Sequence, residues 1–283
     1  MKAPTIREKK RLRSHFGFTK IPFSKYMKAS QMFDSTSQRD LKYGLDMWTE
    51  VKGFALVTGP TGVGKSITLR SFLQELSDTR YIVFDVSALP ATVNGFLRLL
   101  SRKLGLPMRQ YTADFFDAAQ KYLMSYEQEH GAHPILVVDD AEGLTPDVVD
   151  AIRRLTTYDL DSQDRFSVLI SGIEGLLEVL QMKLLEPLRA RFSFVQSLRP
   201  FGLEDTRNYI RFHLERANAD PNLFTDDAMR RIFQASMGRP RSINQLAVQA
   251  LIQTAVQGRD QIDGTFMKNL IAAHPLYQNQ GAE

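Results

Sequence analysis

The sequence predicts an α/β fold in which a doubly wound, parallel, five-stranded sheet is followed by a small helical domain. The first observation behind this prediction is a series of short apolar runs, of the kind typical of strands buried in a parallel sheet. The second is that amphipathic helical patterns separate these runs, as expected where helices connect parallel strands. The third is a change near residue 200, beyond which only helical patterns follow. Together they indicate one sheet domain and a smaller helical companion, which suits a chain of 283 residues.

Each element has its own local pattern. The five expected strands cover residues 54–58, 81–85, 135–139, 168–170 and 192–195, of which the last has the weakest pattern. The helices expected between them cover residues 66–76, 93–104, 113–129 and 146–158. Those expected in the helical domain cover residues 203–217, 226–236, 240–256 and 265–273. Thr225, followed by Asp226 and Asp227, predicts a helix N-cap with favourable acids in the first turn.

These patterns divide the chain into four expected segments. Residues 1–50 form a basic N-terminal arm and lead-in segment, residues 51–199 the sheet domain, residues 200–275 the helical domain and residues 276–283 a tail. The run from Lys9 to Arg13 is basic, and we interpret it as a solvated arm, with contact to DNA or to a partner protein as the alternative.

The composition excludes several kinds of protein. With 43% hydrophobic residues the chain can bury a core, and a formal net charge of +4 is compatible with nucleic-acid binding without requiring it. The absence of cysteine excludes disulfides, thiolate zinc sites and a cysteine nucleophile, and it is typical of a reducing cytosol. The start lacks the apolar core of a secretory signal, and no stretch reaches the ~18 apolar residues of a membrane span. We therefore expect a cytoplasmic protein that does not act at a membrane.

The clearest motif follows the first expected strand. The pattern GxxxxGK[ST] is matched in full by Gly59, Pro60, Thr61, Gly62, Val63, Gly64, Lys65 and Ser66. Its glycines let the backbone curl so that N–H groups point at phosphate oxygens, helped by the N-terminus of the next helix. We expect Lys65 to reach the β- and γ-phosphates of ATP and Ser66 to bind Mg²⁺. The alternative, a chance glycine turn, is disfavoured by the strand before the motif and the helix after it.

A second pair of candidates stands at the end of the strand expected over residues 135–139. In open α/β sheets, nucleotides bind at the carboxyl ends of the strands, which is where Asp139 and Asp140 lie. We expect Asp139 to hold the magnesium through water and the next carboxylate to orient the attacking water. The alternative is a pair of acids that cap a strand at a solvated turn.

With these motifs the chain resembles the ExeA branch of the AAA+ ATPases, from about Phe16 to Ala250. Beside the phosphate loop, the most specific piece is Gly238–Asn244, which is similar to the G-x-P-R-x-I-N signature that opens a lid-domain helix. The other pieces are Phe16-Gly17-Phe18, Pro22-Phe23, Asp139-Asp140-Ala141-Glu142 and the turn at Gly172.

The resemblance implies an AAA+ P-loop NTPase that hydrolyses ATP, with a helical lid and with nucleotide and Mg²⁺ bound at the subunit interface of a homo-oligomer. By position, Arg241 corresponds to the sensor arginine that reads the γ-phosphate from the lid. Arg191 corresponds to the arginine finger that is offered to the neighbouring subunit, with Arg189 as the alternative. The first sensor, a polar residue after the fourth strand, corresponds to Ser171 or Glu174, and the sequence leaves both open.

The sequence departs from this family at one catalytic position. The family usually has Asp-Glu at the strand end, where this chain has Asp139-Asp140. Aspartate is one methylene shorter, and a misplacement of ~1 Å in a catalytic group costs on the order of a hundredfold in rate. We therefore expect slow hydrolysis, or else that Glu142 takes over the role.

The resemblance covers proteins with different tasks. Transposition helpers, similar to MuB, TnsC, IstB and TniB, form ATP-bound rings or filaments on double-stranded DNA and recruit a transposase. In ExeA-type secretion or membrane-complex ATPases, a membrane span and a further domain follow. Because this chain ends soon after the helix expected over residues 265–273, we expect the first role. The alternatives are the secretion role and a replication-initiator or helicase-loader role.

DNA contacts have one candidate surface. Arg98 and Arg102 lie on the polar face of the helix expected over residues 93–104, with Lys103 beside them. This spacing is able to follow the phosphates of DNA without reading its sequence. A solvated helix face explains the same charges.

Overall fold

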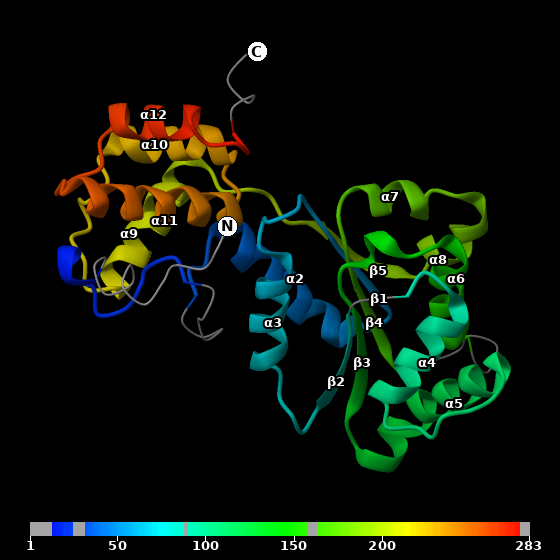
Figure 1. Cartoon of the computed structure of the whole chain (residues 1–283). Helices are drawn as coiled ribbons and strands as arrows, with labels where there is room; N and C mark the ends of the chain where they lie inside the picture. The colour runs from blue at the N-terminus through cyan, green and yellow to red at the C-terminus, as the bar shows by residue number, and fades with distance from the viewer. Residues whose placement is uncertain (1–12, 25–31, 88–89, 158–163, 278–283) are drawn as a thin grey trace. The chain divides into compact units, whose positions relative to one another are not determined.

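The protein is represented by a computed structural model that describes residues 13–24, 32–87, 90–157 and 164–277. Contacts divide the chain into two compact units (Figure 1). The sheet unit contains residues 36–60 and 65–198. The helical unit contains the residues up to 35, residues 61–64 and the residues from 199 onward. The expected boundaries at residues 50, 199 and 275 remain proposals.

The sheet unit is built on a parallel sheet of five strands in the order β2-β3-β4-β1-β5. The strands are β1 (Phe54–Thr58), β2 (Tyr81–Val86), β3 (His133–Val138), β4 (Ser167–Ser171) and β5 (Phe192–Ser197). Every residue of β1, β3 and β4 is buried, as the continuous apolar runs predict for the centre of a parallel sheet. The predicted fold class is confirmed.

Helices cover both faces of this sheet. Figure 1 shows α2 and α3 on one face and α4, α5 and α6 on the other. The bounds are α2 (Thr36–Val51), α3 (Lys65–Glu75), α4 (Val93–Lys103), α5 (Thr112–His130), α6 (Pro146–Leu155), α7 (Gly175–Leu180) and α8 (Glu186–Arg189), with 3-10 turns η2 (Ala141–Gly143) and η4 (Lys183–Leu185). The larger core lies between α4, α5, α6 and the central strands.

Helix α2 lies inside the segment that the sequence assigns to an arm and lead-in. Its buried side chains Leu41, Leu45 and Trp48 recur at helical spacing and face the sheet. A Cβ atom at Gly44 would lie 2.5 Å from the ring of Phe194 on β5, so glycine here allows the helix to pack closely on the edge strand.

The helical unit has a core of its own. Its helices are α9 (Leu203–Arg216), α10 (Asp226–Ser236), α11 (Pro240–Gln257) and α12 (Gly264–Ala272). Phe18 and Phe23 from the N-terminal segment are buried in this core, and the backbone N–H of Phe23 donates to His213 Nδ1 at 3.3 Å. The predicted N-cap is confirmed, because Thr225 Oγ1 accepts from the N–H of Ala228 at 3.2 Å. In the basic opening run, only Arg13 lies within the described residues.

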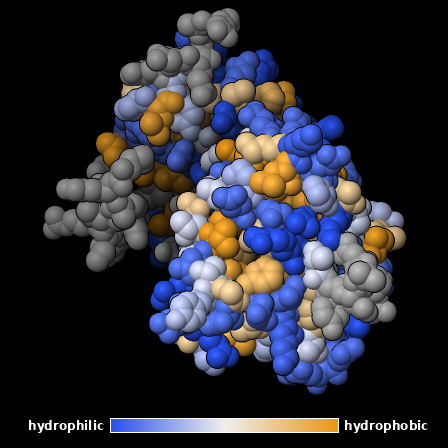
Figure 2. All heavy atoms as spheres, turned by 90° about the vertical axis from the view of Figure 1, so that its right-hand side faces the viewer, coloured by the Kyte–Doolittle hydropathy of each residue, from blue (hydrophilic) through white to orange (hydrophobic). Residues whose placement is uncertain are grey.

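The surface over α4 to α7 is mostly hydrophilic, with separate apolar spots (Figure 2). Exposed apolar side chains on the connections beside these helices are Met108, Tyr111, Met182 and Leu184. None of the helices within the described part of the chain is long and apolar enough to cross a bilayer.

Candidate nucleotide-binding site

The phosphate loop connects β1 to α3. The φ angles of Gly59, Gly62 and Gly64 are +150°, +81° and +109°, values that side-chain-bearing residues rarely adopt. Lys65 opens α3 and is 8% exposed, and its Nζ donates to the Gly59 carbonyl at 2.8 Å. Ser66 is exposed in the first turn of the helix. A curled backbone, a helix N-terminus and an ammonium group at one turn form an arrangement that binds phosphate groups.

Residues 61–64 of this loop group with the helical unit, in which Gly62 contacts Arg241. The N–H of Arg241, in the first turn of α11, donates to the Gly62 carbonyl at 3.2 Å. A Cβ atom at Gly62 would lie 2.9 Å from the Cβ of Arg241. Glycine is also required at Gly238, where φ is +68° and a Cβ atom would overlap the carbonyl of Phe201. Both contacts restrict the sequence at the start of α11 and in the loop.

The carboxyl ends of β3 and β4 bring two predicted site residues together. Val138 pairs with Ile170, so Asp139 and Ser171 are the next residues along on adjacent strands. Ser171 in turn pairs with Val57 on β1, just before the phosphate loop. The Oδ1 atom of Asp139 and the Oγ atom of Ser171 are buried and have no hydrogen-bond partner among the described residues.

These two buried oxygens fit a bound nucleotide with Mg²⁺. A buried polar atom without a partner costs about 1–3 kcal/mol, so its site is expected to meet a ligand or water. Magnesium is usually held by one or two protein oxygens, water and the phosphates of the nucleotide. Asp139 and Ser66 are the protein oxygens that would hold it here. No group of three or more His, Cys, Asp or Glu side chains suited to a metal occurs in the described parts of the chain.

The two candidates for orienting water differ in placement. Asp140 is exposed and has a left-handed backbone with φ of +55°. Glu142 lies in η2 against the turn after β4, and its Oε2 would be 3.5 Å from a Cβ atom at Gly172. That turn directly follows Ser171, whereas the other first-sensor candidate, Glu174, is exposed and is the N-cap residue of α7.

Arg191 lies at the amino ends of the strands, opposite the ends that carry the phosphate loop. The N–H of Phe54, the first residue of β1, donates to the Arg191 carbonyl at 3.3 Å. The 5 residues of β1 therefore separate Arg191 from the phosphate loop of its own chain, a span of about 17 Å. The guanidinium donates to Thr156 Oγ1 at 2.7 Å and Thr157 Oγ1 at 3.4 Å. Arg189, the alternative finger, donates from Nη1 to the Leu180 carbonyl at 2.9 Å.

The candidate DNA contacts are on α4. Arg98, Arg102 and Lys103 are all exposed. The guanidinium of Arg98 lies 5.8 Å from the centre of the Phe115 ring, a cation–π contact with α5. The side chain of Arg98 therefore already has a contact within the protein. Arg102 and Lys103 lie in the last turn of α4.

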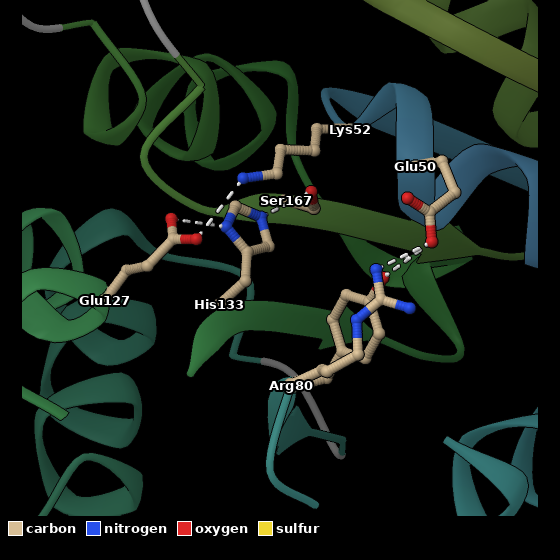
Figure 3. A network of polar contacts seen from close by, with 7 residues as sticks. Glu50, Lys52, Arg80, Glu127, His133 and Ser167 are labelled. Atoms are coloured by element: carbon tan, nitrogen blue, oxygen red, sulfur yellow. Dashed lines mark hydrogen bonds and ion pairs between the residues drawn. The ribbon is translucent and has the colours of Figure 1, made fainter. Parts of the chain in front are cut away.

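A polar network that the sequence does not predict lies at the amino ends of the strands (Figure 3). His133 opens β3 and is 3% exposed; its Nδ1 is 2.9 Å from Glu127 Oε2 and its Nε2 is 3.0 Å from Ser167 Oγ. Lys52 Nζ pairs with Glu127 Oε1 at 3.4 Å. A second pair beside it joins Arg80 to Glu50 at 2.8 Å.

Burial sets the charge of this network. It lowers the pKa of His133, because a buried imidazolium is poorly solvated, and the hydrogen bond with Glu127 opposes this only in part. Burial alone would raise the pKa of Glu127, but the contacts with His133 and Lys52 bring it below its usual value. At neutral pH the imidazole is therefore neutral: Nδ1–H donates to Glu127, and Nε2 accepts from the hydroxyl of Ser167.

Comparison with known proteins identifies the sheet unit. Residues 49–180 match the family model described as AAA domain. The match covers less than half of the chain, and it indicates an enzyme that hydrolyses ATP. It is 29% identical over 259 residues to the General secretion pathway protein A of Aeromonas hydrophila, and the match covers 87% of this ATPase but only 45% of that protein's length.

Solved structures agree with this fold. The Aeropyrum pernix ORC2 protein has a TM-score of 0.64 at 11% identity, over 89% of this ATPase and 71% of that chain. The Aeropyrum pernix ORC1 protein, solved in complex with DNA, has a TM-score of 0.60 at 18% identity, over 83% and 64% of the two chains. At these identities the likeness concerns the fold, and it supports the AAA+ P-loop fold with a helical C-terminal region. The predicted ATPase activity is likewise supported by the AAA-domain match.

Proposed function

We propose that this ATPase is a nucleotide-dependent switch that assembles with copies of itself, and that each hydrolysis site is completed by the next copy. Residues 59–66 bind the triphosphate, with Lys65 on the β- and γ-phosphates. Ser66 and Asp139 hold Mg²⁺, which supplies neutralisation of the phosphate charge. Ser171 donates a hydrogen bond at the γ-phosphate, and Arg241 reads the same phosphate from α11.

The position of Arg191 carries this proposal. The span of about 17 Å along β1 exceeds the reach of an arginine side chain, so Arg191 cannot serve the phosphate loop of its own chain. A catalytic arginine at this edge therefore acts on a second copy. Arginine fingers supplied in this way stabilise the charge of the transition state. The same reasoning holds for Arg189, which precedes Arg191 on the same edge.

The attacking water has two candidate positioning groups. Asp140 follows the magnesium carboxylate directly, as in the wider family, and its short side chain then makes hydrolysis slow. Glu142 lies against Gly172, next to the γ-phosphate donor Ser171. Slow hydrolysis through Asp140 would keep the assembled state for longer, so this residue would act as a timer.

The relative in Aeromonas hydrophila favours a role in secretion. Its printed name is General secretion pathway protein A, and the match covers 87% of this ATPase. The switch would then drive assembly or remodelling of a secretion complex at a membrane through a membrane-bound partner. The match spans only 45% of that relative's length, so the role of the whole relative comes to this chain only as a proposal.

A second candidate is the DNA role, in which the assembly coats double-stranded DNA and recruits a transposase. The exposed Arg102 and Lys103 on α4 and the net charge of +4 support it, as does the shared fold with an ORC1 protein solved with DNA. The same observations support the remaining alternative, a replication-initiator or helicase-loader role.

One sedimentation experiment separates these roles. The purified protein is centrifuged with ADP or with a slowly hydrolysed ATP analogue, each with and without duplex DNA of unrelated sequences. The secretion role predicts assembly that needs the ATP analogue and is indifferent to DNA. Assembly that requires DNA would instead favour the second candidate, and a monomer under every condition would contradict the switch itself.

A further inference from the structure

The phosphate loop makes a main-chain contact that the proposed roles of its residues do not use. The carbonyl of Gly62 accepts a hydrogen bond from the backbone N–H of Arg241 at 3.2 Å. The two residues belong to the same compact unit, although Gly62 lies in the loop and Arg241 in the first turn of α11. The role proposed for Arg241 concerns its guanidinium, so the bond from its main chain needs an explanation of its own.

This bond fixes the direction of one peptide in the loop. The peptide that joins Gly62 to Val63 is trans, so its C=O and its N–H point in opposite directions. A carbonyl that is held toward Arg241 therefore turns the N–H of Val63 to the other side of the loop. The side chain of Val63 is buried, which limits rotation of the same peptide. A backbone N–H presented by a glycine-rich loop in front of a helix is a donor suited to a phosphate oxygen.

The contact is also closely packed. A Cβ atom at Gly62 would lie 2.9 Å from the Cβ of Arg241, 3.5 Å from its Cδ and 3.7 Å from its Nε. The side chain of Arg241 therefore runs along the loop at the residue whose carbonyl its N–H meets. Main chain and side chain of one arginine contact the loop at one glycine, which only a residue without a Cβ atom permits.

The donor is held in place by the helical unit itself. The first N–H groups of a helix have no partner within it, so the N–H of Arg241 is available to the loop. Ahead of this turn, the N–H of Phe201 donates to the carbonyl of Gly238 at 2.9 Å. Behind it, Tyr209 on α9 donates from its hydroxyl to Asn244 Oδ1 at 3.0 Å, and Tyr209 is 9% exposed. Contacts on both sides thus fix where the start of α11 lies within this unit.

We infer that the backbone N–H of Arg241 is a positioning group for the phosphate loop, and that it holds the Gly62–Val63 peptide with the N–H of Val63 toward the bound phosphates. This inference rests on the proposed binding of the triphosphate by residues 59–66. Hydrogen bonds in series polarise one another, so the bond at the carbonyl also strengthens the donor on the other side of the peptide. The helical unit thereby takes part in phosphate binding independently of the Arg241 guanidinium.

The test compares two variants of the full-length protein that differ in one N–H group. Arg241→Pro removes both the guanidinium and the N–H at position 241. The double variant Arg241→Ala/Ser242→Pro also lacks the guanidinium and also carries one proline in the first turn of α11, but it keeps the N–H at position 241. Proline is tolerated in the first turn of a helix, so both variants are expected to fold.

Calorimetric titration with ADP measures the difference. Arg241→Pro should bind ADP about three- to tenfold more weakly than the double variant, which is the effect of about one hydrogen bond. Equal ADP affinities of the two variants would overturn the positioning role and leave the phosphate loop assigned as before. Parental ADP affinity in Lys65→Ala would instead overturn the phosphate loop itself, and the inference with it.

Amide hydrogen exchange gives a readout that general destabilisation would not reproduce. At saturating ADP, the N–H of Val63 should exchange at least about tenfold more slowly than without ADP in the parental protein, because it is then bound to a phosphate. The slowing should persist in the double variant and be largely lost in Arg241→Pro. Equal slowing at Val63 in both variants would contradict the inference.

Folding has its own control. Exchange at Leu246 and Leu251, which are buried on α11, should be the same in both proline variants. If it is faster in Arg241→Pro, Tyr209→Phe provides a second route, since it releases α11 from α9 and introduces no proline. It should reduce the slowing at Val63 about threefold, and an undiminished slowing would count against the inference.

Discussion

The two ends of strand β4 carry matched serines in opposite situations. Ser167 and Ser171 are both buried, with exposures of 1% and 0%. At the amino end, Ser167 is bonded to His133 within a network in which the charged groups are paired (Figure 3). At the carboxyl end, the hydroxyl of Ser171 and the Oδ1 of Asp139 have no partner among the described residues.

The difference agrees with the proposal that the carboxyl ends of the strands bind a ligand, whereas the polar groups at the amino ends are satisfied within the chain. A buried polar group that is satisfied within the chain lowers the free energy of the folded state, whereas one left without a partner raises it. Such a cost persists in a folded protein where the group serves function. The phosphate loop follows β1 at the same ends of the strands, which supports the proposed site there.

The largest expected effect is on ATP binding at the carboxyl ends of the strands. Lys65→Ala removes the ammonium that meets the phosphates, and ATP affinity should fall by about 3–6 kcal/mol, at least about a hundredfold. Binding of a fluorescent ATP analogue to the purified variant measures this. Near-parental affinity and turnover would contradict the phosphate-loop assignment.

The next effect distinguishes the two carboxylates. Whichever of Asp140 and Glu142 orients the water, its amide variant should hydrolyse ATP about a hundredfold more slowly at nearly unchanged ATP affinity. Single-turnover hydrolysis by Asp140→Asn and Glu142→Gln separates them, each variant serving as the control for the other.

The timer hypothesis adds a third variant. Asp140→Glu should speed hydrolysis and shorten the lifetime of the ATP-bound assembly. A parental rate for Asp140→Asn would rule the timer out.

The two serines of β4 provide the most direct comparison of the amino and carboxyl ends of the strands. Ser167→Ala leaves His133 Nε2 buried without a donor, and the free energy of unfolding should fall by about 1–3 kcal/mol with hydrolysis unchanged. Ser171→Ala removes a hydroxyl without a protein partner, so stability should be kept or should rise slightly while hydrolysis slows. Urea denaturation and single-turnover hydrolysis of both variants test this. Loss of stability in Ser171→Ala together with slower hydrolysis in Ser167→Ala would contradict the assignment of the ligand site to the carboxyl ends of the strands.

The smallest expected effect concerns DNA. If the assembly binds duplex DNA, its affinity should fall steeply as salt rises, through release of counterions. Replacement of Arg98 and Arg102 together should flatten the salt dependence by up to about two units if each meets a phosphate. Because Arg98 already contacts Phe115, we expect most of the change to come from Arg102. An unchanged slope in the double variant would identify this helix face as merely solvated.

The carboxyl edge could be predicted from the sequence because its residues are adjacent to strand ends. The glycine pattern of residues 59–66 and the apolar run before Asp139 are local signals, and a parallel sheet brings strand ends together. The orphaned state of Ser171 could not be predicted, because it depends on which side chains pack around it.

The amino edge and the N-terminal segment could not be predicted for a different reason. Ser167 and His133 are 34 positions apart, as are Arg191 and Thr157, and no local period records such contacts. The sequence did not predict helix α2, because the exposed apolar residues Tyr43 and Met47 interrupt its apolar stripe. The partners of Phe18 and Phe23 lie about 200 positions along the chain, in the helical unit.

The account depends most on a site that two copies share, and a mixing experiment tests this directly. Arg191→Ala should bind ATP but hydrolyse it ~10³- to 10⁵-fold more slowly, the range known for arginine fingers. Asp139→Asn should be inactive through its own site while still offering Arg191 to a neighbour. Mixing the two inactive variants should restore part of the hydrolysis rate, with a maximum at intermediate ratios, because some interfaces then combine an intact site with an intact arginine. No recovery at any ratio, with both variants shown to assemble, would contradict the shared site.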